Sequence, residues 1–118
     1  MKLKNNLSEQ AFVQEYRDKG IFNEHQLLQI YFGVKLGQDV SIYAKPEFTW
    51  RQMDQISHGL DYGIDVSKYA DTRYSWQQMQ AIKYALIGGV DVTPYIEFDT
   101  DPNTINLFAK SLRLEKQS

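Results

Sequence analysis

Apolar side chains recur at intervals of three and four residues in three separate stretches of the chain. The stretches contain Leu27, Ile30 and Val34, then Met53, Ile56 and Leu60, then Met79, Ile82 and Leu86. This spacing places the apolar side chains on one face of an α-helix. Each stretch follows a capping residue with a glutamine three positions later, which is the pattern of a capping box, and each ends at a glycine. The pattern therefore predicts three amphipathic helices of about 13 residues.

The three stretches belong to copies of one 26-residue unit. Residues 23–48 and 49–74 are identical at ten of 26 positions without a gap, and residues 49–74 and 75–100 are identical at nine. Self-similarity at such a period is typical of proteins built from stacked repeats. The predicted fold class is all-α: a short helical repeat array whose three full units, each a helix plus a very short helix, span residues 23–48, 49–74 and 75–100.

The remaining residues predict one capping helix at each end of a single domain, residues 1–118. Ser8 is expected to cap an N-terminal helix within residues 1–22, which Gly20 ends. Asp101 aligns with the first position of the unit, so residues 101–114 are expected to form the C-terminal capping helix, followed by a frayed polar tail.

Each unit continues after its glycine with the pattern Asp-Val-Ser/Thr-x-Tyr. We expect a one-turn helix here, capped by the hydroxyl residue, because Pro94 follows Thr93 and proline suits the first helical position. The three aspartates are Asp39, Asp65 and Asp91. One interpretation is that these carboxylates line one edge of the array and hold cations or a basic partner. We favour a local role, in which each carboxylate accepts backbone N–H bonds and organises the turn.

Other recurring residues also favour a structural interpretation over a functional one. Trp50 and Trp76 are expected to pack against the neighbouring unit, rather than to be exposed anchors for a partner. Gly33 and Gly59 stand inside predicted helices, where glycine is unfavourable. We expect them to admit a neighbouring short helix, with a ligand groove as the alternative. The tyrosines that close the units are expected to be half-buried, with their hydroxyls at the surface.

The second unit carries the most distinctive motif of the chain. Trp50-Arg51-Gln52-Met53 with Ile56, followed by Gly63-Ile64-Asp65-Val66-Ser67-Lys68-Tyr69-Ala70, resembles a helical repeat of many proteins from low-GC Gram-positive bacteria. The resemblance covers residues 23 to about 100 and implies a role on a mobile genetic element, such as a plasmid, conjugative element or phage. It brings no catalytic residue. This chain departs from the motif at Glu24, Gln38, Ala85 and Ile96.

Composition narrows the functional classes further. Thirteen basic and fifteen acidic residues give a net charge of −2, which argues against a strongly basic nucleic-acid binder and against a DNA mimic. The absence of cysteine excludes disulfides and thiolate metal sites, and two histidines alone do not make a metal site. We therefore expect no metal and no cofactor. No apolar run approaches the roughly 18 residues of a membrane span, so we expect a cytoplasmic location and no contact with a membrane.

The sequence favours a non-catalytic protein-interaction module over an enzyme, with an unidentified protein as the partner. The candidate partner-binding residues lie outside the apolar stripes: Arg51, Asp54, His58, Arg73, Gln77, Gln80 and Lys83. Two alternatives stay open. One is a nucleic-acid-binding accessory factor with a basic patch formed by Lys35, Arg51, Lys68, Arg73 and Lys83. The other is an inhibitor of a host defence nuclease.

Overall fold

The computed structural model describes the backbone of residues 2–117 and the side chains of residues 10–117. Five α-helices and three 3-10 helices make up this part of the chain, which confirms the predicted all-α class. In chain order they are α1 (Lys2–Asp18), α2 (Glu24–Lys35), η1 (Val40–Ile42), α3 (Trp50–Asp61), η2 (Val66–Lys68), α4 (Trp76–Ile87), η3 (Thr93–Tyr95) and α5 (Pro102–Gln117).

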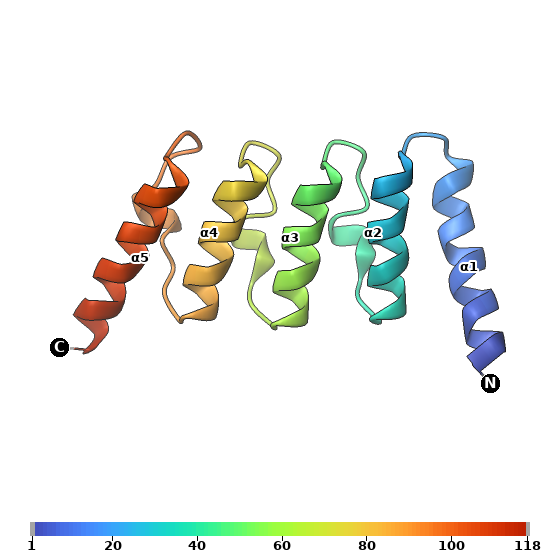
Figure 1. Ribbon diagram of the computed structural model, residues 1–118, viewed down its shortest axis with the longest axis horizontal. Coiled ribbons are helices and arrows are strands. Elements are labelled where there is room, and N and C mark those ends of the chain that lie inside the picture. The colour runs from blue at the N-terminus through green and yellow to red at the C-terminus, as the bar shows by residue number, and fades with distance from the viewer. Residues whose placement is uncertain (1, 118) are drawn as a thin grey trace.

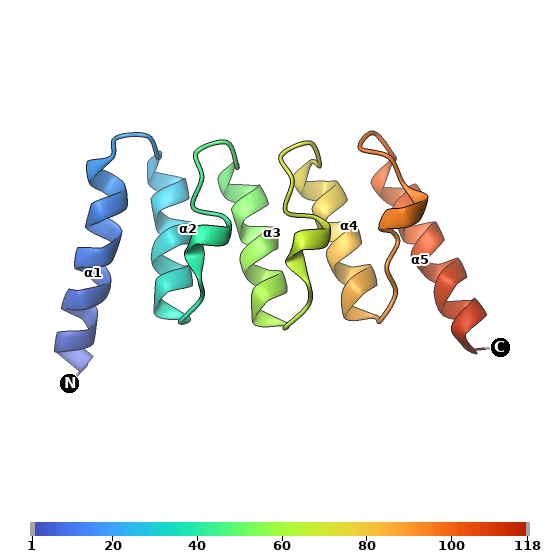
Figure 2. The same cartoon turned by 180° about the vertical axis from the view of Figure 1, so that it is seen from behind.

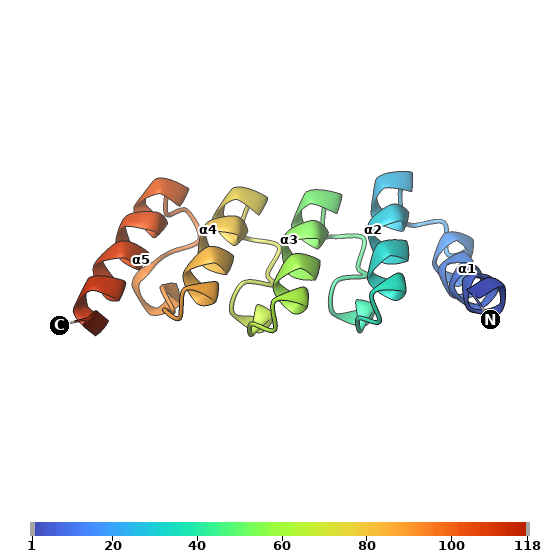
Figure 3. The same cartoon turned by 60° about the horizontal axis from the view of Figure 1, so that its bottom comes forward.

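The α-helices stand side by side in one row, in chain order (Figure 1). Helices α2 to α5 all run in the same direction, and α1 runs the opposite way (Figure 1). The connecting segments with their 3-10 helices return along the other face of the row and form a second layer (Figures 2 and 3). The Cα atoms span 53 × 30 × 16 Å, so the molecule is an elongated slab only two layers thick.

The capping boxes predicted at the starts of α2, α3 and α4 are all present. At α2, the Asn23 side chain accepts the N–H of Gln26 at 2.8 Å, and the Gln26 side chain accepts the N–H of Asn23 at 2.8 Å. The same glutamine also donates its side-chain amide to the carbonyl of Phe48, at 2.7 Å. Gln52 and Gln78 make the equivalent bonds to Tyr74 and Thr100, so each cap ties its helix to the loop that leads into the next unit.

The helix ends also follow the prediction. Gly37, Gly63 and Gly89 have φ values of 75°, 75° and 86°, the left-handed conformation that glycine adopts most easily. The short segments that follow correct one detail. Asp39 and Asp65, not the hydroxyl residues, cap η1 and η2, and each carboxylate accepts the N–H and the hydroxyl of the serine two positions later. The favoured local role of the aspartates is thereby confirmed.

The glycines inside the helices allow tyrosine to pack against the helix backbone. A Cβ added to Gly33 would lie 1.8 Å from the Tyr43 hydroxyl oxygen, and one added to Gly59 would lie 2.0 Å from that of Tyr69. Both tyrosines are fully buried, so the expectation of half-buried rings is wrong for them. Tyr95 departs from it in the other direction, at 56% exposed. We attribute this difference to Ala85, whose methyl group occupies the place that the tyrosine hydroxyl takes beside Gly33 and Gly59.

The helices at the two ends of the array begin or end at residues other than those predicted. Helix α1 already begins at Lys2, so Ser8 lies within it and is not its N-cap. Its end at Gly20, with φ 69°, is as predicted. Helix α5 runs to Gln117, three residues past the predicted limit at residue 114, so residues 115–117 are helical rather than frayed. Over the described residues, no helix is both long and apolar enough to cross a membrane.

Candidate functional site

The outer face of α2 carries a row of apolar side chains that the core does not use. Leu28, Phe32 and Leu36 lie four residues apart and are 49%, 48% and 60% exposed. Side chains at this spacing lie one above another along a helix. We call these three residues the α2 ridge.

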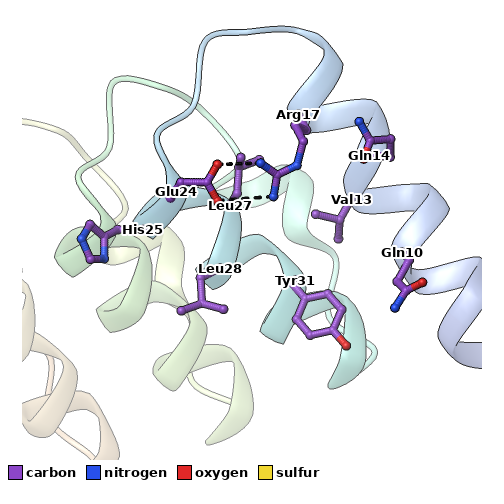
Figure 4. Close-up of a pocket in the computed structure, with 9 residues that line it drawn as sticks. All are labelled: Gln10, Val13, Gln14, Arg17, Glu24, His25, Leu27, Leu28 and Tyr31. Atoms are coloured by element: carbon purple, nitrogen blue, oxygen red, sulfur yellow. Dashed lines mark hydrogen bonds and ion pairs between the residues drawn. The ribbon is translucent and has the colours of Figure 1, made fainter.

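One groove borders the α2 ridge on the side of α1. Its volume is about 570 Å³, and its apolar lining comes from Val13, Leu27, Leu28 and Tyr31. Figure 4 shows these side chains between the two helices, with the Arg17–Glu24 pair crossing from α1 to α2 above them. The Arg17 guanidinium nitrogen lies 2.6 Å from the Glu24 carboxylate, which links the two helices at this end of the groove.

A second groove, of about 290 Å³, borders the ridge on the side of α3. Phe32 and Leu36 line it from α2, and Asp54, His58 and Asp61 line it from α3. We call it the α2/α3 groove. An apolar wall thus faces a wall with two carboxylates, a surface that suits an apolar side chain next to a cationic one.

The structure places two of the predicted partner-binding residues, Asp54 and His58, in the α2/α3 groove. Arg51 is exposed at the start of α3, where its guanidinium carbon lies 5.1 Å from the ring centroid of Trp50 and 5.5 Å from that of Trp76. Trp50 in turn stacks on His25 of the preceding unit, with ring centroids 5.6 Å apart. The tryptophans therefore pack between units, as predicted.

Gln77 and Gln80 lie on α4, the former exposed and the latter partly buried. Arg73 lies in the loop before α4. Its guanidinium pairs with Asp71 at 2.8 Å and stacks over the ring of Phe98, 3.9 Å from the centroid. Arg73 thus holds two neighbouring loops together and does not line either groove.

Lys83 is the clear exception among the predicted residues, because it is only 1% exposed. Its ammonium nitrogen lies 2.6 Å from Nδ1 of His58, so the side chain bridges α3 and α4. Desolvation by burial lowers the pKa of Lys83 below its ordinary value, opposed by the nearby charge of Asp54. The assignment of Lys83 to an exposed binding surface is therefore wrong.

The structure also locates the five residues of the predicted basic patch. Besides the buried Lys83 and the paired Arg73, Lys68 pairs with Asp91 at 3.1 Å. Lys35 and Arg51 remain, each lying over aromatic rings. Among the side chains that the structure describes, no three histidine, aspartate or glutamate residues are grouped so that they could hold a metal ion.

The α2 ridge is the part of this face that the sequence analysis missed, although the repeat contains the signal. The ridge positions correspond to Asp54, His58 and Tyr62 in the second unit and to Gln80, Tyr84 and Gly88 in the third. A stripe that is fully aliphatic or aromatic in one unit, but contains a polar or charged residue in each of the others, is not required by the shared fold. Comparison of the units position by position finds it.

Comparisons of the chain with known protein families, with curated protein sequences and with solved structures gave no match.

Proposed function

We propose that the protein is a non-catalytic interaction scaffold that binds a protein partner on the outer face of its helices, at the α2 ridge. The observation that carries this proposal is the row of exposed side chains formed by Leu28, Phe32 and Leu36. Contiguous exposed apolar surface with polar surroundings marks interaction sites in soluble proteins. The grooves on both sides of the ridge supply the concave surface in which partner side chains are desolvated.

The chemistry of the α2/α3 groove favours a partner segment with apolar and basic side chains. Phe32 and Leu36 offer apolar contact, while Asp54 and Asp61 attract a lysine or arginine beside it. An amphipathic helix laid along a groove is a common way to satisfy both demands. The paired or buried state of Lys68, Arg73 and Lys83 gives no comparable support to nucleic-acid binding.

The test is a photo-crosslinking amino acid placed at Phe32, with Tyr84 as the matched control site. Tyr84 holds the equivalent position on α4 and is similarly exposed, at 51% against 48%. In the native host, the Phe32 site should form a specific adduct with a protein, and the Tyr84 site should not. Phe32→Ser should abolish recovery of that protein, whereas Tyr84→Ser should leave it unchanged. Equal adducts from both sites, or an undiminished recovery with Phe32→Ser, would refute the proposal.

We also propose a setting on a mobile genetic element, which rests only on the resemblance of the repeat motif. The identity of the crosslinked protein tests both this setting and the idea of a nuclease inhibitor. A host restriction or CRISPR nuclease as the adduct would support inhibition by steric blocking.

A further inference from the structure

Helix α5 exposes four positions that are buried in both α3 and α4. Thr104, Leu107, Phe108 and Ser111 correspond to Gln78, Ala81, Ile82 and Ala85 of α4, which are all buried. Leu107 is 66% exposed, although the equivalent Ala81 is 5% exposed and Gln55 of α3 is 6% exposed. These four residues line one shallow hollow on α5. Together with Leu114, which is 58% exposed, we call them the α5 outer face.

Among the residues that the structure describes, no other α-helix packs against this face of α5 (Figure 1). Helices α3 and α4 each pack against a following helix, and α3 also packs against the short helix of its own unit. In the described part of the chain, α5 is the last helix of the row (Figure 1). The ring of Tyr95 stacks on that of Phe108, with centroids 6.3 Å apart. The α5 outer face is thus a continuation of the helix-packing surface that joins the units.

The side chains of the α5 outer face are complementary in size to those of the same face on a second copy of the chain. Thr104, Leu107, Ser111 and Leu114 follow the spacing three, four, three, which is the seam of a packed helix pair. Small and large side chains alternate along the seam. In an antiparallel pair centred at Ala109, Leu107 lies opposite Ser111 of the other copy, and Leu114 lies opposite Thr104. A large side chain therefore faces a small one at every level.

A parallel pair lacks this complementarity. It would place Leu107 opposite Leu107 and Ser111 opposite Ser111, which crowds one level and leaves a void at the next. Voids and crowding in a packed interface are both unfavourable. A two-fold axis perpendicular to the helices generates the antiparallel arrangement, in which the same surface serves both subunits.

We propose that the protein forms a two-fold symmetric dimer through antiparallel packing of the α5 outer faces, so that the row of helices continues into the second copy. This inference is independent of the proposed binding of a partner at α2. Because Leu107 is mostly exposed, its substitution tests the interface without disturbing the core.

The decisive experiment uses disulfide crosslinking, because the natural chain has no cysteine. A mixture of Leu107→Cys and Ser111→Cys chains should form disulfide-linked dimers containing one of each under mild oxidation. Leu107→Cys alone should crosslink much less, because the antiparallel register separates the two introduced sulfurs. Efficient crosslinking of Leu107→Cys alone, or the absence of a mixed dimer, would overturn the proposed register.

Sedimentation equilibrium supplies the second measurement on the unmodified protein. At about 100 μM, well above the Kd of a micromolar interface, the parent chain should sediment as a dimer. Leu107→Lys should sediment as a monomer with an unchanged circular dichroism spectrum. Leu28→Lys, at an exposed leucine on α2, is the matched control and should remain dimeric. A monomeric parent chain, or dissociation by Leu28→Lys, would refute an interface at α5.

Discussion

Replacing Gly59 by alanine should destabilise the protein, although the same change stabilises most helices. In the interior of an ordinary helix, alanine is favoured over glycine by roughly 0.5–1 kcal/mol. Here the new Cβ would lie 2.0 Å from the hydroxyl oxygen of Tyr69 and 2.7 Å from Cγ1 of Val66. Neither distance is tolerable, so the tyrosine has to move.

The magnitude follows from what Tyr69 would lose. Its side chain is fully buried, and its hydroxyl donates to the carbonyl of Gln55 at 2.7 Å. Expulsion of a buried side chain of this size forfeits roughly 1.5–3 kcal/mol of apolar burial. The lost hydrogen bond adds about 1 kcal/mol. After subtraction of the gain in helix propensity, Gly59→Ala should cost about 2–3 kcal/mol, or a Tm lower by roughly 10 °C.

Urea unfolding followed by circular dichroism measures this effect. The same substitution in a Tyr69→Phe background should be less harmful by about 1 kcal/mol, because the closest contact is gone. Tyr95→Phe is the matched control for the hydroxyl, since Tyr95 is exposed and its change should leave stability unaltered. A Gly59→Ala protein as stable as the parent would refute the packing argument. An equal penalty in both backgrounds would refute the assignment to Tyr69.

Three further changes test the electrostatics of the array. Asp65→Ala should lower the Tm at pH 7. The bonds from Ser67 hold the pKa of the Asp65 carboxyl below its ordinary value, so its stabilisation is present above about pH 4 and lost as pH falls through the lowered folded pKa. Thermal melts between pH 7 and pH 2 should therefore show a weaker acid dependence in the variant than in the parent. Lys83→Met removes a buried amine together with its 2.6 Å contact to His58, so two opposing effects on the free energy of unfolding act at pH 7 and the pH dependence is the test. Burial lowers the folded pKa of Lys83, so the parent gains stability as pH rises between that lowered value and about 10.4, and urea titrations of the variant should lack this gain. Arg51→Gln should lower the free energy of unfolding by about 0.5–1 kcal/mol for each of the two tryptophan rings that the guanidinium contacts. Because both tryptophans of the chain contact Arg51, the fluorescence emission of the variant should also shift.

Local signals made the helices of this fold predictable. A capping box satisfies orphan N–H groups within four residues of sequence, and a left-handed glycine does the same for carbonyls at the helix end. Both signals act between near neighbours, so they can be identified without knowledge of the tertiary structure. The turns at the aspartates also depend on contacts between near neighbours and were predictable. The sequence alone did not show whether the carboxylate or the hydroxyl caps the short helix.

Contacts between units were not predictable in this way. The apolar period identifies which side of a helix faces the core, but it does not say which flanking position faces the next helix. Lys83 illustrates the difference. Its polar character suggested exposure, yet its position corresponds to the buried Ser57 and Ala109 on the neighbouring helices. Treating the repeat as a guide to burial, and not only to secondary structure, would have placed it correctly.

The exposure of Tyr95 is also explained by comparing equivalent positions in the three units. Each buried tyrosine is paired with a glycine ten positions earlier, at Gly33 and Gly59, and the exposed one is paired with Ala85. In the first two units the tyrosine packs against the helix of its own unit. In the third unit the methyl group of Ala85 blocks this packing, and Tyr95 stacks on Phe108 of α5 instead. The substitution frees an aromatic ring to contact the last helix, where the α5 outer face begins.

Polar residues distinguish the junctions between units, which share the same apolar stripe. Between the first two units, Gln38 bonds to the hydroxyl and the carbonyl of Ser57, and Tyr43 donates to the same glutamine. At the equivalent positions, the next junction has Ile64 and Lys83, and the last has Val90 and Ala109. A unit moved to another place in the row would bring Gln38 to a junction without its serine, or Lys83 to one without His58. Unpaired buried polar groups are costly, so these contacts make each junction specific to the two units that form it, whereas the apolar stripe favours stacking at all of the junctions alike.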